Sequence, residues 1–207
     1  MHPNAHPRGG VALRARRDRD ARLHRGGVTR PLKISAQLLA AAAVAGLLAL
    51  LVWRVTHQPK PLKIGKPAPW FNLQRLDGNG KVNLKSLRGK AVVVNFWASW
   101  CGPCKTESAA LERAWQKHRG DGVVVLGVDY HDVAGDARDF VRRHGITYPI
   151  VRDHDGLVGT QYDLTGVPET FFIDRRGRLV GAHLEGPIDK GDNAAKFERA
   201  LEAALSS

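Results

Sequence analysis

The chain has two cysteines, separated by two residues, in the segment Trp100-Cys101-Gly102-Pro103-Cys104. An apolar, β-branched run, residues 91–97, precedes this segment, and a helix-compatible stretch, residues 105–118, follows it. A thiol at the start of a helix meets unpaired backbone N–H groups and the positive end of the helix dipole, and both lower its pKa. Two intervening residues also allow a disulfide, which needs α-carbons within roughly 7 Å. The pattern predicts thiol–disulfide oxidoreductase chemistry.

Three other roles for a cysteine pair fit this sequence less well. A structural zinc site needs four ligands, but there is no second cysteine pair and the first histidine after Cys104 is His118. A purely structural disulfide here would close a very short loop, with little entropic gain. Attachment of c-type haem needs histidine directly after the second cysteine, where this chain has Lys105. We therefore expect no metal and no cofactor, with the Cys101–Cys104 disulfide as the redox-active group.

The net charge of +12 is concentrated at the amino terminus. Residues 1–33 contain nine basic residues and two acidic ones, whereas the rest of the chain has 23 basic and 18 acidic residues. The tail is rich in Gly, Pro and His and lacks apolar periodicity, which predicts a disordered segment. Because the remainder is only mildly basic, the charge does not predict a nucleic-acid partner.

Residues 34–53 contain no charged side chain and are rich in Leu, Ala and Val. Twenty helical residues span roughly 30 Å, the thickness of a hydrocarbon core. Lys33 and Arg54 bracket the run, and Trp53 suits an interfacial anchor. We expect a single transmembrane helix rather than a buried core helix. A cleaved signal peptide fits less well, because no small-x-small site follows Trp53.

The basic tail indicates the orientation of this helix. By the positive-inside rule, residues 1–33 should stay in the cytoplasm and everything after Arg54 should lie outside the cell membrane. Disulfides persist in that compartment, which agrees with a redox-active cysteine pair. Residues 54–63, with Pro59 and Pro61, are expected to form an extended linker to a domain at residues 64–207.

The outer domain shows alternating strand and helix patterns. Residues 77–87 suggest a hairpin followed by a short turn, and the tetrapeptide 174–177 suggests a turn between two strands. The expected strands are 91–97, 122–128, 170–173 and 179–183, and the expected helices are 101–118, 136–144 and 192–205. This order predicts an α/β fold in which helices cover both faces of a sheet.

Particular motifs resemble a known family. The segment 95–104 (NFWASWCGPC) resembles thioredoxin-fold proteins, and 65–69 (GKPAP) resembles the amino-terminal extension of the redoxin and TlpA-like branch. The segment 166–174 (GVPETFFID), preceded by 153–156 (DHDG), is similar to membrane-anchored reductases of cytochrome c maturation, the CcmG/DsbE type, with ResA and TlpA as relatives. The resemblance covers roughly residues 62–205 and implies a thioredoxin-like fold, with a central mixed sheet flanked by helices.

The resemblance also implies roles for the residues around the disulfide. Cys101 matches the attacking thiol and Cys104 the resolving one, and we expect Cys101 to be the exposed member at the helix start. Pro168 matches a cis-proline facing the disulfide, and Val167 matches the residue whose backbone bonds an extended substrate segment. Trp100, Gly102 and Pro103 are the remaining residues expected to contact substrate.

Two glutamates are candidates for proton transfer. Glu107 lies where relatives keep an acidic residue one turn past the second cysteine, and Glu169 matches the acidic residue after the cis-proline. The buried aspartate of ordinary thioredoxin is replaced by Asn95, which cannot accept a proton. The proton acceptor for Cys104 is therefore expected to be Glu107 or Glu169, and the sequence leaves the choice open.

Other noticeable side chains have simpler interpretations. We expect Trp97 to pack in the core. Asp129, His131, Asp132 and Asp136 follow a strand and are expected to form a solvated loop rather than a metal site.

The resemblance implies reduction of apocytochrome c before haem attachment, with electrons from a membrane thiol carrier of the CcdA or DsbD type. Three alternatives remain. They are a general reductase for other exported proteins, a redoxin-type peroxidase, and a non-enzymatic binding platform. A peroxidase would need a peroxidatic cysteine in a Pro/Thr-rich loop, and the sequence has no such site.

Overall fold

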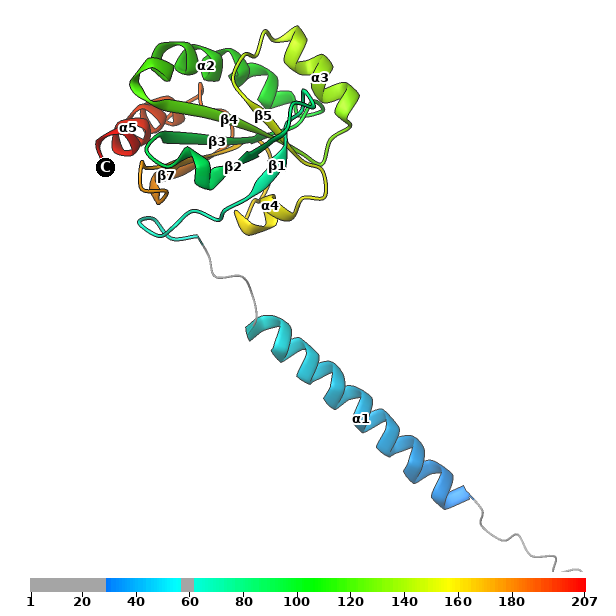
Figure 1. Ribbon diagram of the computed structural model, residues 1–207. Helices are drawn as coiled ribbons and strands as arrows, with labels where there is room; N and C mark the ends of the chain where they lie inside the picture. Colours follow the sequence, from blue (N-terminus) through cyan, green and yellow to red (C-terminus); the bar gives the residue numbers. More distant parts are fainter. Residues whose placement is uncertain (1–28, 57–61) are drawn as a thin grey trace, which may run out of the picture. The chain divides into compact units, whose positions relative to one another are not determined.

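The computed structural model describes residues 29–56 and 62–207, in two compact units divided between Gln58 and Pro59. Most of the expected tail and half of the expected linker, residues 1–28 and 57–61, lie outside the described residues. Figure 1 shows a single long helix, α1, and an α/β domain.

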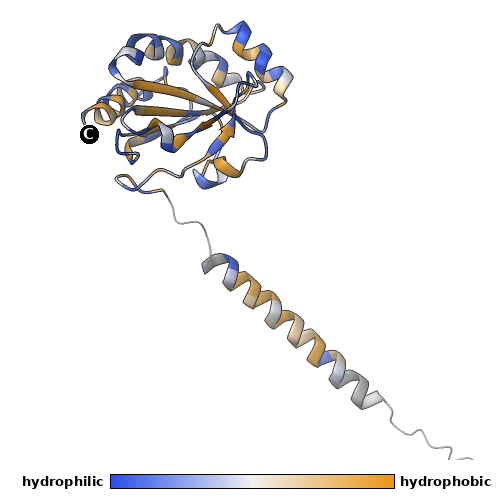
Figure 2. Cartoon of the chain, viewed as in Figure 1, coloured by the Kyte–Doolittle hydropathy of each residue, from blue (hydrophilic) through white to orange (hydrophobic). Residues whose placement is uncertain are grey.

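Helix α1 spans Thr29–Thr56 and extends beyond the uncharged run at both ends. Within it, Ser35–Arg54 is long and apolar enough to cross a membrane, and these side chains are exposed in the structure. Figure 2 shows hydrophobic colour along most of this part of the helix. It is the one such helix in the described ranges.

The domain is built on a five-stranded mixed sheet in the order β5-β4-β3-β6-β7, with a separate two-stranded sheet of β1 and β2. Strand β3 is central, parallel to β4 and antiparallel to β6. The strands are β1 Asn72–Gln74, β2 Lys81–Asn83, β3 Ala91–Trp97, β4 Val123–Tyr130, β5 Ile150–Asp153, β6 Glu169–Ile173 and β7 Leu179–Glu185. The helices are α2 Gly102–His118, α3 Ala134–Arg143, α4 Leu157–Gln161 and α5 Asn193–Ser206, with short 3-10 turns at Leu84–Leu87 and Arg119–Asp121.

Every residue of β3 is buried, because alternate side chains enter two hydrophobic cores. Val93 and Trp97 belong to the core under α2, α3 and α5, whereas Val94 and Phe96 belong to the core under α4 and the amino-terminal segment. The ring of Trp97 lies 4.6 Å from that of Phe140 on α3, so its predicted core position is confirmed. Helices cover both faces of the sheet, as predicted (Figure 1).

The sequence patterns located most elements but missed β5 and α4. Residues 153–156 form the expected turn, yet they do more than reverse the chain. The buried carboxylate of Asp153 accepts hydrogen bonds from the N–H groups of Val158 (3.1 Å) and Gly159 (2.7 Å). This bonding fixes α4, a helix too short to give a periodic apolar pattern.

Candidate active site

The cysteine pair lies where β3 ends and α2 begins. Cys101 is the N-cap of α2, and its Sγ accepts a hydrogen bond from the N–H of Cys104 at 3.1 Å. Pro103 lies in the first turn, where its missing N–H leaves no helical bond unmade. The two cysteines form a disulfide with α-carbons 5.3 Å apart. The sulfur atoms therefore lie at the amino-terminal end of a 17-residue helix, where the dipole stabilises a thiolate.

The two cysteines are almost equally buried, which corrects the expectation that Cys101 is the exposed one. Their exposed fractions are 3% for Cys101 and 2% for Cys104. The carbonyl oxygen of Val167 lies 3.5 Å from Cys101 Sγ, so a second loop covers the sulfur. Trp100, next to the disulfide, is 61% exposed and directs its indole N–H to the carbonyl of His131 at 3.4 Å.

The loop beside the disulfide contains a cis Val167–Pro168 peptide bond, as predicted. Within the described part of the chain, the N–H of Val167 donates no hydrogen bond. The loop is held by Glu169, whose Oε1 accepts bonds from Thr165 N–H (2.8 Å), Thr165 Oγ1 (2.7 Å) and Gly166 N–H (3.0 Å). A backbone donor without a partner among the described residues therefore lies in the loop next to Cys101, and such a donor can bond an extended segment.

Glu107 lies three residues after Cys104, on the same side of α2. Its side chain is buried, and its oxygens accept bonds from Asn95 Nδ2 (2.8 Å) and the N–H of Ile188 (2.9 Å). Burial raises the pKa of Glu107 to about 7, although both hydrogen bonds oppose the shift. A carboxyl group with this pKa can take up and release a proton near neutral pH.

Asn95 connects the helix to the sheet at this point. Besides Glu107, its amide donates to Thr170 Oγ1 at 3.0 Å, across the β3–β6 pair in which Asn95 faces Thr170. Glu169 is also buried, and its second oxygen lies 3.7 Å from His183 Nε2. The two glutamates are therefore differently bonded. Glu107 lies on the helix of the cysteines, whereas Glu169 holds the loop of the cis-proline.

Sequence reasoning missed a clamp on the segment before the disulfide. The carboxylate of Asp132 accepts hydrogen bonds from the N–H and the Oγ of Ser99, two residues before Cys101. Arg152 donates to the carbonyl of Asp132 (2.7 Å) and to the carboxylate of Asp129 (3.0 Å). The sequence signal for this clamp is the group of acidic residues Asp129, Asp132 and Asp136 near the end of β4.

The expectation of a solvated loop is therefore wrong for Asp129, which is fully buried. Burial raises its pKa to about 7, while the hydrogen bond from Arg152 opposes the shift. In the described ranges, His, Cys, Asp and Glu side chains nowhere gather three together in an arrangement that could hold a metal ion.

Comparison with known proteins agrees with this geometry. Residues 64–182 match the model of the AhpC/TSA family. The chain is 36% identical over 146 residues to the thiol:disulfide interchange protein DsbE of Pseudomonas fluorescens biotype C, covering 68% of this chain and 79% of that protein. It is 33% identical over 119 residues to the thiol-disulfide oxidoreductase ResA of Bacillus thuringiensis, covering 58% of this chain and 68% of the relative.

A solved structure supports the fold. It is that of a DsbE-type interchange protein from Chlorobium tepidum, with a TM-score of 0.61 and 31% identity, covering 68% of this chain and 99% of that one. These matches and the disulfide at the start of α2 lead to the same conclusion. The chain belongs to the AhpC/TSA family and is a thioredoxin-fold thiol–disulfide oxidoreductase of the DsbE and ResA type.

Proposed function

We propose that this protein is a membrane-anchored, extracytoplasmic reductase that reduces the disulfide of apocytochrome c before haem is attached. The observation that carries the proposal is the meeting of three groups at one place. These are the Cys101–Cys104 pair, the N–H of Val167 beside it, which bonds to none of the described residues, and the buried Glu107 on the same helix.

In the first step, the reduced enzyme binds an extended substrate segment along Val167. The thiolate of Cys101 attacks one sulfur of the substrate disulfide. The substrate S–S bond breaks, a mixed disulfide forms, and the released substrate thiolate takes a proton from water. The end of α2 lowers the pKa of the attacking thiol, since Cys101 is its N-cap.

In the second step, Cys104 gives its proton to the carboxylate of Glu107 and attacks Cys101 Sγ. The second substrate sulfur leaves as a thiolate and takes a proton from water, so the substrate is released with two thiols. The enzyme is left with the Cys101–Cys104 disulfide, the state seen in this structure. Two electrons from a membrane thiol carrier, of the CcdA or DsbD type, then restore the dithiol.

A chemical need supports apocytochrome c as the substrate. Thioether bonds to haem form from free thiols, whereas cysteines outside the cytoplasm tend to oxidise. A reductant tethered at the membrane surface would keep those cysteines reduced at the place where haem is attached. The apolar helix Ser35–Arg54 and the basic segment before it support the anchoring and the orientation.

Deletion of the gene tests the substrate. We expect c-type cytochromes to fall, and a small-molecule thiol added to the medium to restore them. The intact gene should complement the deletion, whereas a Cys101→Ala variant should not. Normal cytochrome levels together with oxidised exported thiol proteins would instead identify a general reductase.

A further inference from the structure

Three segments meet at the end of the sheet opposite the disulfide. The segment 63–70 pairs with the turn 174–178, through Ala68 N–H to the Gly177 carbonyl at 3.0 Å. The segment 84–90, just before β3, contacts the same turn through Gly89 N–H to the Arg175 carbonyl at 2.8 Å. These bonds bring residues far apart in the sequence onto one surface, which we call the basic face.

The basic face carries a dense group of exposed cations. Its eight basic side chains are Lys63, Lys66, Lys85, Arg88, Lys90, Arg175, Arg176 and Arg178. Three acidic residues lie near this charge, and one of them, the exposed Asp155, lines a hollow together with Trp70. Asp174 is buried, and its Oδ1 accepts from the N–H groups of Arg176 and Arg178, while the exposed Asp121 lies 3.2 Å from His118. A strong positive potential is therefore directed to solvent.

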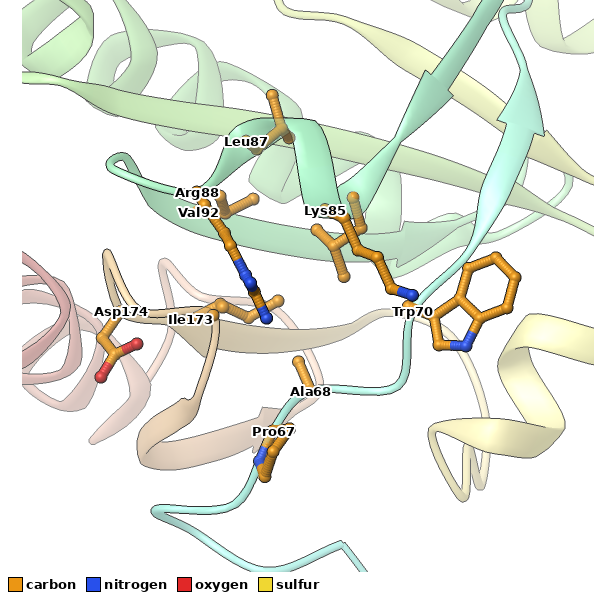
Figure 3. A pocket seen from close by; sticks show the side chains of 11 residues that line it. Pro67, Ala68, Trp70, Lys85, Leu87, Arg88, Val92, Ile173 and Asp174 are labelled. Atoms are coloured by element: carbon orange, nitrogen blue, oxygen red, sulfur yellow. The ribbon is translucent and has the colours of Figure 1, made fainter.

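An exposed apolar side chain lies on the same face. Trp70 is 57% exposed. The ammonium group of Lys85 lies 4.4 Å from the centre of the Trp70 ring. Figure 3 shows Lys85, Trp70 and Arg88 around one hollow. Its volume is about 120 Å³. Tryptophan next to lysine and arginine is the combination that favours the interface of a membrane.

We propose that the basic face binds the surface of a membrane containing anionic phospholipid. This inference rests on the proposed anchoring, because the chain reaches this face at Lys63, nine residues after the apolar span ends at Arg54. Basic side chains near such a surface attract anionic headgroups, and Trp70 would insert among them. The Asp174 carboxylate borders the hollow, and its Oδ1 accepts hydrogen bonds from the N–H groups of Arg176 and Arg178 in the turn.

Binding through this face would orient the active site. Strand β3 runs from Ala91, beside the basic face, to Trp97, just before the disulfide. Its seven residues rise about 3.3 Å each, so the disulfide lies about 20 Å from the face. The docked domain would present Cys101 away from the bilayer, toward substrates in the surrounding compartment.

Vesicle co-sedimentation tests the proposal with residues 62–207. This part is suitable because, among the described residues, those that form its two hydrophobic cores all lie within 62–207. We expect binding to vesicles of phosphatidylcholine mixed with phosphatidylglycerol, and none to phosphatidylcholine alone. The triple variant Lys66→Glu, Lys85→Glu and Lys90→Glu should bind at least about a hundredfold more weakly. The single variant Trp70→Ala should bind several-fold more weakly.

A matched control has the same change in net charge elsewhere. It is Arg113→Glu, Arg138→Glu and Lys196→Glu, one exposed residue from each of α2, α3 and α5. It should retain nearly full binding, and added salt should release the wild-type domain. Equal loss in both triple variants, equal binding to neutral vesicles, or no binding to anionic vesicles would overturn the proposal.

Insulin-disulfide reduction in solution separates this inference from the proposed function. The Lys66, Lys85 and Lys90 variant should reduce insulin at the wild-type rate, because these residues lie about 20 Å from Cys101. If the wild-type domain reduces insulin fully but does not bind anionic vesicles, only the proposal of membrane binding is refuted. Loss of reduction in the wild-type domain would refute the reductase assignment alone.

Discussion

Cys101 and Cys104 differ in their hydrogen-bond partners rather than in their exposure. Cys101 Sγ accepts the N–H of Cys104 and lies 3.5 Å from the Val167 carbonyl, at the loop where substrate would bind. Cys104 lies inside the first turn, with Glu107 one turn farther along the helix. We therefore propose that the first sulfur attacks substrate and that the second attacks the first.

Replacing Cys104 tests this division of roles. The variant Cys104→Ala should accumulate a mixed disulfide between Cys101 and substrate, since nothing remains to resolve it. Non-reducing gel electrophoresis would detect the adduct, and Cys101→Ala serves as the control that should form none. Adducts that form only with Cys101→Ala would reverse the assignment.

The raised pKa of Glu107 makes stability depend on pH. The folded protein holds this proton up to about pH 7, whereas the unfolded chain loses it near 4.5. The contribution of Glu107 to the free energy of unfolding is therefore fully present below pH 4.5 and is lost as the pH rises toward 7. The loss amounts to about 3 kcal/mol at most.

Glu107→Gln should remove this part of the pH dependence. The amide remains neutral, and a reoriented Asn95 can accept its N–H, so the variant should be the more stable protein above neutral pH. Urea unfolding of the oxidised protein at about pH 5 and about pH 8 measures the difference. Asp129 also makes the free energy of unfolding depend on pH, and it does so equally in the wild-type protein and in the variant. An unchanged pH dependence in the variant would show that Glu107 is ionised throughout this range.

The same variant tests proton transfer. Glu107→Gln should slow the resolving step. The rate of substrate reduction should then no longer change with a midpoint near pH 7. Glu169→Gln is the matched control, because its Oε1 can still accept from Thr165 and Gly166. It should slow substrate reduction only slightly and leave the pH midpoint unchanged. A midpoint lost in Glu169→Gln but kept in Glu107→Gln would assign the proton to Glu169.

At the scale of the elements, the site depends on the ends of three parallel strands. Strands β3, β4 and β5 finish side by side, and Arg152 of β5 bonds both Asp129 of β4 and the carbonyl of Asp132. Asp132 in turn holds Ser99, just before the disulfide. The position of Trp100 and Cys101 thus depends on side chains from neighbouring strands.

Asp132→Ala should loosen this segment. The carboxylate accepts from Ser99 N–H, Ser99 Oγ and Val133 N–H, so its loss should destabilise the domain by about 1–3 kcal/mol. Substrate reduction should fall several-fold. Asp136→Ala, an exposed neighbour on α3, is the control and should change stability by about 0.5 kcal/mol or less. Equal effects of the two substitutions on activity would show that the clamp has no role.

The sequence predicted those elements that have a local signal. The β-branched run of β3 and the apolar spacing of α2 are properties of consecutive residues, and both elements are where the patterns placed them. The buried Glu107 accepts a hydrogen bond from Ile188, 81 residues away, and the buried Asp129 accepts one from Arg152, 23 residues away. Such partners meet only in the folded chain, so the pattern alone could not distinguish buried acids from solvated ones.

At the scale of the whole molecule, the proposed orientation places the redox site outside the cytoplasm. A reporter fused after Trp53 should be active outside the cytoplasm, because the basic segment before the apolar helix is retained inside. A reporter fused after Lys33 should be active in the cytoplasm. Cytoplasmic activity at the Trp53 junction would contradict both the orientation and the compartment in which the disulfide chemistry is proposed.

The reduction potential of the Cys101–Cys104 couple tests the central claim most directly. Thioredoxin, a reductant, lies at about −270 mV, and the oxidant DsbA lies at about −120 mV. Gly102-Pro103 between the cysteines matches the reducing member. Equilibration of residues 62–207 with thiol–disulfide buffers should give a value much closer to about −270 mV than to about −120 mV. A value near that of DsbA would contradict the account, because the protein would then donate disulfides to its substrates.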